Sequence, residues 1–531
     1  MSVNLSSVLI SDEIDQKCVD VLQENGIKVL KNTKLSKEEL LKEIPNHGGL
    51  IVRSATKVTA DVIAAGKRLK IIGRAGTGVD NIDCDEATKR GIIVMNTPGG
   101  NTLSAAELTC TLICCVARNI HNGDRAMKEK KWSERKALMG CELHGKTLGI
   151  VGLGRIGKEV ALRMQSFGMK TIGFDPIIPA EVSAEFGVQW MQLEELWPLV
   201  DFITVHTPLI PQTRNLINDE VFAKCKKGVK VINVARGGII DEEALLRALE
   251  SGQCGGAGLD VYTSEPPKDF TLAQHPKVVA TPHLGASTSE AQKRVAIEIA
   301  LQFVDLVKGK QLFGAINANA MTNALSEESR AWVTLGQRLG ELAGCVGGQA
   351  TGNIKVTALG SSLKQAGSYL GAAVLAGYLT TKQKPGGDGV TLNLINAPAM
   401  AKEQNLQVEF LQADQCPGTY SAMVIIGLSD GFQASGTTCN GGAVLLSVQG
   451  QVFPTPASLS GTAIVFSAAE STQLLTAISG AVVGESVSGV TLSSGGAGDR
   501  WGVVSFLAPP SQKSIENLKS VVKAMSVVTF Q

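Results

Sequence analysis

Aromatic side chains, histidines and an excess charge of one sign are all scarce in this chain. Its 531 residues include five Trp, four Tyr and six His, and 50 Lys and Arg balance 49 Asp and Glu to a net charge of +1. Because the charges nearly cancel, neither nucleic acid nor an anionic membrane surface is favoured as a partner. With so few histidines, one that ends a predicted strand is a stronger candidate for catalysis.

Long hydrophobic runs and paired cysteine motifs are also missing. The most apolar helical stretch, residues 105–117, contains Glu107 and is too short to span a bilayer. None of the eleven cysteines has the paired spacing of metal ligands, so we predict no metal site. Cys110, Cys114 and Cys115 fall on one helical pattern and should pack as small apolar side chains. An odd cysteine count without an N-terminal signal sequence predicts a cytoplasmic protein.

The length and the distribution of charge predict several domains. A chain of 531 residues is too long for a single hydrophobic core. The last 216 residues hold only 23 of the 99 charged side chains, so we expect a catalytic front portion and a differently built rear portion. The predicted segments are 1–100 and 287–315 for a substrate-binding domain, 101–286 for a nucleotide-binding domain, 316–452 for an intervening domain and 453–531 for a terminal domain.

A glycine motif gives the most specific local signal. A β-branched run at residues 147–151 leads into Gly152, Gly154 and Gly157, and a helical pattern follows at residues 158–167. In a dinucleotide fold these glycines allow a tight turn, a close approach of backbone to a pyrophosphate, and close helix–strand packing. The helix N-terminus adds unpaired N–H groups and a positive dipole end. The alternative is an ordinary strand–turn–helix unit with glycine at its turn.

An acidic residue extends this motif. Asp175 ends the next predicted strand, residues 170–174, at close to the offset expected for the carboxylate that binds a ribose 2′-hydroxyl. A carboxylate at this place would repel a 2′-phosphate. The sequence therefore predicts NAD, rather than NADP, as the cofactor.

Strand and helix signals alternate through the front portion. This alternation predicts α/β domains with parallel sheets, with Ser36 and Asn101 as helix N-caps. The helical pattern of residues 287–310 could return to pack on the first domain. The tail predicts a β-α-β-β-α-β order, in which a last helix over residues 511–525 carries an apolar face. That face comprises Ile515, Leu518, Val522 and Met525.

Three polar residues follow predicted strands downstream of the glycine motif. Arg236 could hold a substrate carboxylate, and Glu265 paired with His283 would form an acid–base couple suited to oxidising an alcohol. Each has a plainer alternative as a surface or turn residue. His206 is the rival base, although we favour a structural role for it near the cofactor.

Two arginines follow strands of the first domain. Arg53 ends one predicted strand, and Arg74 opens a glycine-rich loop after the next. Together with loop N–H groups they could hold an anion. The alternative is a pair of ordinary β–α loops with solvated arginines.

With these residues in view, the chain resembles the D-2-hydroxyacid dehydrogenases, and among them the long, animal-like members that oxidise phosphoglycerate. The likeness extends over roughly residues 1–315 and is carried by four short segments, RAGTGVDN at 74–81, GLGRIG at 152–157, NVARGG at 233–238 and PHLGAST at 282–288. The resemblance implies a Rossmann nucleotide domain inserted in a flavodoxin-like substrate domain. It also implies two C-terminal α+β domains, the last ferredoxin-like and similar to amino-acid-binding (ACT-like) regulatory domains.

The resemblance also implies roles for individual residues. Arg236, Glu265 and His283 would be catalytic, with His283 as the acid–base group. The substrate would be bound by Arg53, Ser54, Arg74 and Gly76. The NAD site would comprise Thr77, Gly152, Gly154, Arg155, Ile156, Gly157, Asp175, Thr207, Val234, Asp260, His283, Gly285 and Ala286. Val234 departs from the pattern, since related animal enzymes carry Cys there, but a backbone contact would survive the change.

The implied reaction is NAD-dependent oxidation of 3-phospho-D-glycerate to 3-phosphohydroxypyruvate, the first step of phosphorylated L-serine synthesis. A homotetramer is the implied assembly, and whether the tail binds serine stays open. One alternative is a related reductase of glyoxylate or hydroxypyruvate, which would need neither a phosphate cradle nor the rear extension. Another is a non-catalytic, NAD-sensing protein of the corepressor kind.

Overall fold

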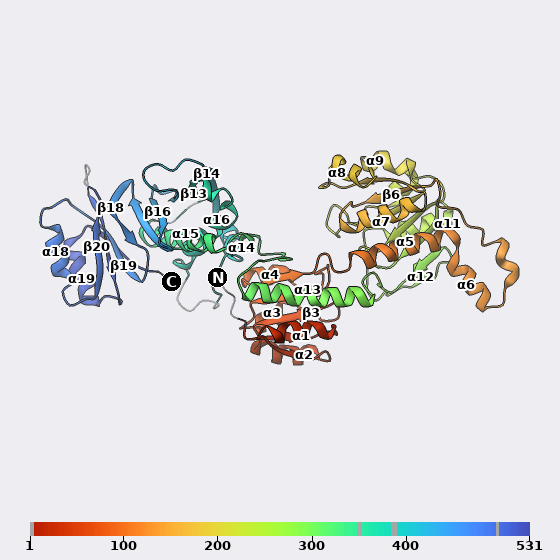
Figure 1. The fold of residues 1–531 in the computed structure, drawn as a ribbon, viewed down its shortest axis with the longest axis horizontal. Helices are drawn as coiled ribbons and strands as arrows, with labels where there is room; N and C mark the ends of the chain where they lie inside the picture. Colours follow the sequence, from red (N-terminus) through yellow and green to blue (C-terminus); the bar gives the residue numbers. More distant parts are fainter. Residues whose placement is uncertain (1–4, 349, 351, 384–389, 495–498, 531) are drawn as a thin grey trace. The chain divides into compact units, whose positions relative to one another are not determined.

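The structure is a computed structural model that describes residues 5–348, 350, 352–383, 390–494 and 499–530. Two compact units divide the chain. The first unit joins Met1–Asn96 to Ile299–Gln531, and the second comprises Thr97–Glu298 (Figure 1). Among the described residues, the second unit contains one sheet and the first contains three.

The first domain is built on a five-stranded parallel sheet in the order β2-β1-β3-β4-β5. This is the flavodoxin-like order, so the predicted fold is confirmed. The strands are β1 (Ser7–Ile10), β2 (Lys28–Lys31), β3 (Gly49–Val52), β4 (Ile71–Arg74) and β5 (Ile93–Asn96). The helices are α1 (Gln16–Glu24), α2 (Lys37–Glu43), η1 (Ile44–Asn46), α3 (Ala60–Ala65) and α4 (Cys84–Lys89). The predicted cap of α2 is confirmed, because Ser36 and Glu39 form a reciprocal capping box.

The second unit has a seven-stranded parallel sheet in the order β12-β11-β10-β9-β6-β7-β8. Its chain order reverses between β6 and β9, as in a doubly wound nucleotide-binding fold. The strands are β6 (Thr147–Val151), β7 (Lys170–Phe174), β8 (Gln189–Trp190), β9 (Phe202–Val205), β10 (Val229–Asn233), β11 (Cys254–Leu259) and β12 (Val278–Ala280). The Rossmann-type prediction is thus confirmed.

Helices cover both faces of this sheet (Figure 1). They are α5 (Thr102–Arg118), α6 (Ile120–Lys128), η2 (Trp132–Lys136), α7 (Arg155–Ser166), α8 (Ala180–Glu185), α9 (Leu193–Leu196), η3 (Trp197–Leu199), α10 (Asp219–Lys224), α11 (Glu242–Ser251) and α12 (Thr271–Gln274). Cys110 and Cys114 of α5 pack against the hydrophobic core, as predicted, and burial raises the pKa of Cys110 to about 12.

One local prediction in this unit was wrong, and a second was confirmed in position only. Helix α7 begins at Arg155, three residues before the predicted start, and its N-cap is Gly154, which has no side chain to signal a cap. Asn101 does occupy the N-cap position of α5, but its side chain makes no capping hydrogen bond.

Helix α13 (Ser289–Val307) returns the chain to the first unit. Its residues Ile299 and Phe303 are fully buried, and the Phe303 ring lies against Gly49 and Gly73 of the first sheet. The predicted return of this helix to the first domain is therefore confirmed.

The intervening part has a mixed six-stranded sheet in the order β14-β13-β15-β16-β17-β18. Its strands are β13 (Asn353–Leu359), β14 (Gln407–Ala413), β15 (Met423–Gly427), β16 (Gln433–Cys439), β17 (Gly442–Val448) and β18 (Gln451–Ser458). Its helices are α14 (Asn319–Thr322), α15 (Glu327–Val346), η4 (Ser361–Leu363), α16 (Gly367–Thr380) and α17 (Ala397–Glu403). Because β18 pairs with β17, this sheet continues six residues past the predicted boundary at 452.

The terminal part is a four-stranded antiparallel sheet in the order β20-β21-β19-β22. It comprises β19 (Thr462–Ala468), α18 (Leu474–Ala481), β20 (Val487–Leu492), β21 (Arg500–Phe506), α19 (Gln512–Val521) and β22 (Ala524–Thr529). This confirms the β-α-β-β-α-β order. The predicted length of the last helix was wrong, because α19 ends at Val521 and Met525 lies on β22.

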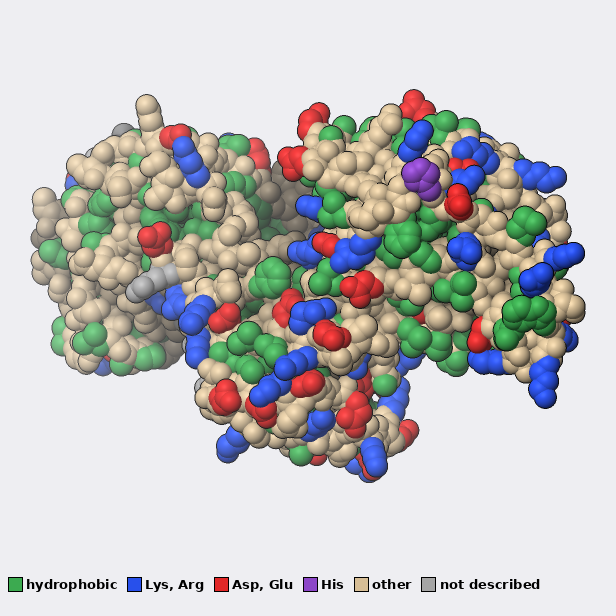
Figure 2. Space-filling view, turned by 45° about the vertical axis from the view of Figure 1, so that its right-hand side comes forward, with side chains coloured by type: hydrophobic (Ala, Val, Ile, Leu, Met, Phe, Trp, Pro, Cys, Tyr) green, Lys and Arg blue, Asp and Glu red, His purple; other side chains and the backbone are tan. Residues whose placement is uncertain are grey.

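The surface reflects the uneven distribution of charge. Figure 2 shows few charged side chains on the visible face of the rear portion, and Lys, Arg, Asp and Glu intermixed on the front portion. Within the described residues no single helix has the length and apolarity to cross a membrane, although the bent pair α5 and α6 meets those criteria when taken together.

Candidate active site

A His–Glu pair lies beyond the carboxyl ends of β11 and β12. His283 Nδ1 and Glu265 Oε2 are 2.6 Å apart, and the side chains are 47% and 37% exposed. The hydrogen bond to Glu265 is the largest cause of the raised pKa of His283. The charges of Glu265 and Asp260 add to this increase, whereas burial and the charge of Arg236 oppose it. Burial pushes the pKa of Glu265 up, but its bonds to His283 and to the Tyr262 N–H produce a net lowering. The pair can therefore hold a proton on imidazole near neutral pH.

A buried carboxylate, Asp260, fixes the loop that presents His283. Its oxygens accept hydrogen bonds from the Thr281 hydroxyl at 2.6 Å and from the Leu284 and Gly285 N–H groups at 2.6 and 2.8 Å. These bonds hold the loop around His283, whose φ of 56° lies in the left-handed region. The sequence placed Asp260 only among the NAD contacts. Its hydrogen bonds show that it also positions the proposed base.

Arg236 follows β10 on a turn that is held by Asn233. The Asn233 side chain is 2% exposed, donates to the Arg236 carbonyl at 2.7 Å and accepts from the Ala235 N–H at 3.0 Å. The next residue must be glycine, because a Cβ on Gly237 would lie 1.9 Å from the Tyr262 carbonyl oxygen. This close approach brings the Arg236 turn to the strand end that precedes Glu265. The charge of Arg236 acts on both Glu265 and His283.

A cavity of about 470 Å³ adjoins the pair. Pro266, Phe270 and Pro282 give it a mainly apolar lining, and Glu265 and His283 form part of its wall. An apolar wall beside the pair strengthens the electrostatic interaction between Glu265 and His283.

The rival base, His206, has a different environment. Burial lowers the pKa of His206 to about 3, and its Nε2 lies 3.0 Å from the Thr204 hydroxyl. An imidazole with so low a pKa stays neutral and is a poor proton acceptor at physiological pH. The structure therefore supports the structural role that we favoured for His206.

The glycine motif forms a turn from β6 into α7. Gly152 has a φ of 98°, and a Cβ on Gly157 would lie 2.0 Å from the Gly152 carbonyl oxygen. A Cβ on Gly154 would meet no protein atom within 4 Å, so this position opens onto free space at the N-terminus of α7. The turn thus offers backbone N–H groups to a phosphate, as dinucleotide binding needs.

Other residues predicted for the cofactor lie along the same sheet edge. Asp175 follows β7, and its carboxylate accepts the Leu153 N–H at 2.8 Å, which places it beside the glycine turn. The Thr207 hydroxyl, after β9, is buried without a hydrogen-bond partner within the described residues. An orphaned buried hydroxyl fits a site that a ligand completes. Arg155 and Ile156 open α7, Val234 follows β10, and Gly285 and Ala286 follow His283.

The anion-binding candidates of the first domain lie at the carboxyl ends of β3 and β4 and in the loops that follow. Arg53 follows β3, and burial lowers the pKa of its guanidinium while the Asp12 charge opposes that effect. Its Nε is buried without a hydrogen-bond partner in the described part of the chain. The exposed Ser54 follows it. Arg74 ends β4, with its guanidinium against Gly76. The Thr77 carbonyl accepts a hydrogen bond from Asn96.

Two polar residues that the sequence analysis missed hold these loops. Asp12 is 4% exposed and accepts the Arg53 N–H at 2.6 Å, the Thr56 N–H at 3.0 Å and the Thr56 hydroxyl at 2.5 Å. Asn81 donates to the Arg53 and Thr56 carbonyls at 2.7 and 2.6 Å and accepts from Arg74 Nε at 2.9 Å. Asn81 therefore joins the two arginine loops. The only sequence feature that could have pointed to Asn81 was its place in the segment 74–81.

Two protein families match parts of the chain. Residues 110–285 match the NAD-binding domain of D-isomer specific 2-hydroxyacid dehydrogenases, and residues 328–446 match the intervening domain of D-3-phosphoglycerate dehydrogenase. A solved structure of D-lactate dehydrogenase from Aquifex aeolicus, complexed with NAD and lactic acid, has a TM-score of 0.51 and 29% identity. The match covers 57% of this chain and 96% of the D-lactate dehydrogenase chain.

Similarity to curated proteins extends over most of the length. The D-3-phosphoglycerate dehydrogenase of Homo sapiens is 55% identical over 454 residues, which are 85% of this chain and 84% of that protein. The D-3-phosphoglycerate dehydrogenase of Bacillus subtilis is 44% identical over 400 residues, 75% of this chain and 74% of that protein. With its Rossmann-type domain, intervening domain and His–Glu pair, the chain therefore belongs to the D-3-phosphoglycerate dehydrogenase family of the D-2-hydroxyacid dehydrogenases.

Proposed function

We propose that this protein is an NAD-dependent enzyme that oxidises 3-phospho-D-glycerate to 3-phosphohydroxypyruvate, the entry reaction of phosphorylated L-serine synthesis. The observation that carries the proposal is the His283–Glu265 pair beside Arg236, at the carboxyl edge of a sheet with an NAD-binding family match. The family membership over 85% of the chain supports the choice of substrate.

The residues of the second unit divide the chemistry among them. His283 takes the proton of the substrate hydroxyl, and Glu265 stabilises the imidazolium that results. The guanidinium of Arg236 binds the substrate carboxylate through paired N–H donors. The hydride of the carbinol carbon would pass to the nicotinamide ring, which is the chemistry that NAD⁺ would supply when bound. In the reverse direction, the His283 imidazolium returns its proton to the carbonyl oxygen.

The cofactor is held, in this proposal, by the turn from Gly152 to Gly157 and by Asp175. The turn binds the pyrophosphate with backbone N–H groups, and the carboxylate of Asp175 accepts a ribose hydroxyl. The open space at Gly154 supports this assignment, as does the buried Thr207 hydroxyl, which has no hydrogen-bond partner in the part of the chain that the structure describes. The roles of the other predicted cofactor residues, including Thr77, stay predictions.

Arg53, Ser54, Arg74 and Gly76 bind the anionic groups of the substrate, in the same proposal. The support is the buried Nε of Arg53, which has no hydrogen-bond partner among the described residues, together with the bonds that Asn81 makes to both arginine loops. A buried guanidinium donor without a partner fits an anion that completes its hydrogen bonding.

We also propose that the chain forms a homo-oligomer, with the tetramer implied by the family resemblance as the expected state. Helix α6 and the segment that follows it extend from the rest of the second unit (Figure 1). The support for an oligomer is that this extension carries exposed apolar side chains. Ile120, Met127, Trp132 and Met139 are between 54% and 83% exposed. Exposed apolar groups gathered on one segment are typical of an interface. The cytoplasmic location stays a prediction.

The proposal is tested by the oxidation of NADH with three oxo acids, namely phosphohydroxypyruvate, hydroxypyruvate and glyoxylate. We expect kcat/KM to be highest for phosphohydroxypyruvate. A His283→Ala variant should lose about 10²- to 10⁴-fold in kcat, as expected for a lost general acid–base group, while its Kd for NADH changes little. A preference for glyoxylate would overturn the proposed substrate. Full turnover in the His283→Ala variant would overturn the proposed base.

A further inference from the structure

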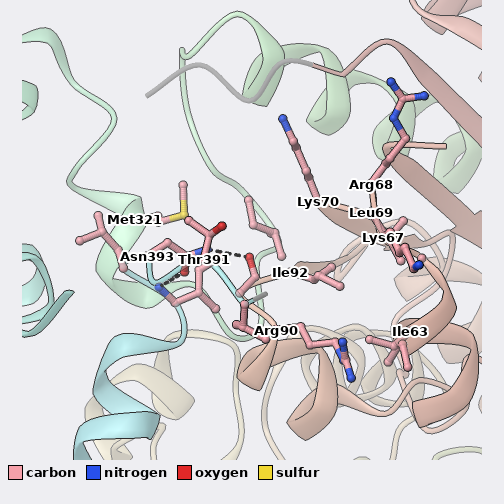
Figure 3. A pocket seen from close by; sticks show the side chains of 17 residues that line it. Ile63, Lys67, Arg68, Leu69, Lys70, Arg90, Ile92, Met321, Thr391 and Asn393 are labelled. Carbon is pink, nitrogen blue, oxygen red and sulfur yellow. Dashed lines mark hydrogen bonds between the residues drawn. The ribbon is translucent and has the colours of Figure 1, made fainter. Parts of the chain in front are cut away.

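A second cavity, of about 750 Å³, lies in the first unit at the amino edge of the parallel sheet. It lies between the loops that enter β4 and β5 and the segment Thr391–Ile395 of the intervening part. Figure 3 shows Lys67, Arg68, Lys70 and Arg90 on one side and Met321, Thr391 and Asn393 on the other. Arg53 follows β3 and Arg74 is the last residue of β4, so the proposed substrate residues lie at the carboxyl edge of the sheet and this cavity is distinct from them.

The charge of the lining is strongly one-sided. Four of its 17 residues are cationic and none is acidic, in a chain whose positive and negative side chains almost balance. The Arg90 guanidinium is paired with Glu86 at 2.6 Å. Lys67 and Arg68 have no side-chain hydrogen bond or ion pair anywhere in the described part of the chain. These two adjacent cations therefore give the cavity an uncompensated positive potential.

The remainder of the lining is mainly apolar. Ile63, Leu69 and Ile92 come from the first domain, and Met321 and Leu394 come from the other side. Each is at most 6% exposed. A cavity of this size with an apolar wall and a few charged groups has the composition of a small-molecule site.

The two sides of the cavity are tied together by hydrogen bonds. The Asn393 side chain donates to the Gly91 carbonyl at 3.0 Å, and the Asn396 side chain donates to the Lys89 carbonyl at 3.3 Å. Asn396 also accepts the Asn393 N–H at 2.8 Å, so the segment has a fixed local shape. These bonds give the cavity a defined shape, which lowers the entropic cost of binding.

We propose that this cavity binds a small organic anion that carries one negatively charged group on an apolar body. Lys67 and Arg68 hold the charged group, and the aliphatic side chains enclose the body. Such a ligand contacts both the first domain and the segment Thr391–Ile395. Its binding site is separate from the residues that we assign to catalysis.

The probe for this site is 8-anilinonaphthalene-1-sulfonate, whose single sulfonate and aromatic body match the cavity. Its fluorescence is titrated in the full-length protein with saturating NAD⁺, so that the nucleotide domain is already filled. The variants are Lys67→Glu and Arg68→Glu. The matched control is Lys28→Glu, which reverses an exposed lysine on β2 of the same sheet.

We expect each cavity variant to weaken the tight class of dye sites at least about tenfold, and the control to change its Kd by less than about twofold. In the wild-type protein, added salt should weaken dye binding to the same tight sites, because salt screens the partly exposed charges of Lys67 and Arg68. Equal affinity in wild type and both cavity variants would overturn the site. The kcat/KM of each variant is measured in parallel. If the cavity variants keep both their activity and their dye binding, the cavity proposal alone is rejected. If the wild-type protein does not reduce phosphohydroxypyruvate, the proposed function alone is rejected.

Discussion

Asp12 provides a sharp test of how the first domain prepares an anion site. The change Asp12→Asn keeps the shape of the side chain but leaves one acceptor oxygen in place of two. If the amide oxygen keeps the bond to the Thr56 hydroxyl at 2.5 Å, the amide NH₂ faces the Arg53 N–H, which now lies 2.6 Å from Asp12 Oδ2. Two donors then oppose each other in a site that is almost fully buried.

The size of the effect follows from these bonds. A hydrogen bond to a charged group contributes about 1.5–3 kcal/mol, and a buried donor without a partner costs about 1–3 kcal/mol. The loop can relieve this cost only by moving Arg53 away from its present position. A loss of about 1.4–2.8 kcal/mol in substrate binding corresponds to about 10- to 100-fold in an equilibrium constant. Because Arg53 binds and transfers no proton in our proposal, KM should rise by this factor while kcat changes less than about threefold.

The assay is steady-state NADH oxidation with phosphohydroxypyruvate, together with a titration of NADH binding. The NADH Kd should stay at the wild-type value. The matched control is Asp15→Asn, because Asp15 caps α1 through the Lys17 N–H at 2.9 Å and makes no bond to the arginine loop. A folded Asp12→Asn protein with a wild-type KM would refute the reasoning.

Three further predictions concern the second unit. Glu265→Gln removes the largest cause of the raised His283 pKa, so that pKa should fall. Because oxo-acid reduction needs protonated His283, the decline of its kcat/KM with rising pH should begin at lower pH than in wild type. An unshifted pH profile would contradict the pairing. Asp175→Ala should raise the ratio of NADPH to NADH kcat/KM by about tenfold or more, because a carboxylate that repels a 2′-phosphate is gone; an unchanged ratio argues against its ribose role. Gly237→Ala places a Cβ 1.9 Å from the Tyr262 carbonyl oxygen and should lower the free energy of unfolding by about 1–3 kcal/mol or more; a wild-type urea midpoint would show that the turn has room.

The features that could be predicted from the sequence are those that depend on the spacing of residues close together in the chain. The turn through Gly152 and Gly157 joins a strand to a helix within a few residues, and the alternation of strands and helices fixes a parallel sheet. Arg236, Glu265 and His283 stood out because each follows a predicted strand, where ligands bind in such sheets. Their proximity in the structure follows from the parallel order of β10, β11 and β12.

The features that could not be predicted depend on residues far apart in the chain. Asp12 bonds to Arg53 and Thr56, which are 41 and 44 positions away, and nothing in the local pattern marks that pairing. The end of α19 was missed for a different reason. Val522 continues the apolar periodicity of the helix, but it is the C-cap, and the β-branched residues after it belong to β22. The cap of α7 was missed because Gly154 has no side chain.

At three of the loops that we assign to the reaction, a buried polar side chain holds the loop by hydrogen bonds. Asp12 holds the Arg53 loop, Asn233 holds the Arg236 turn and Asp260 holds the His283 loop, and all three anchors are at most 4% exposed. A buried polar side chain is costly unless each of its groups is paired, so each anchor stabilises only the loop conformation that satisfies it. The exposed loops therefore acquire a definite shape from a buried residue at the end of a strand or just after it. We infer that loss of an anchor would alter KM or the pH profile before it abolished folding, whereas loss of His283 itself would remove the proton transfer.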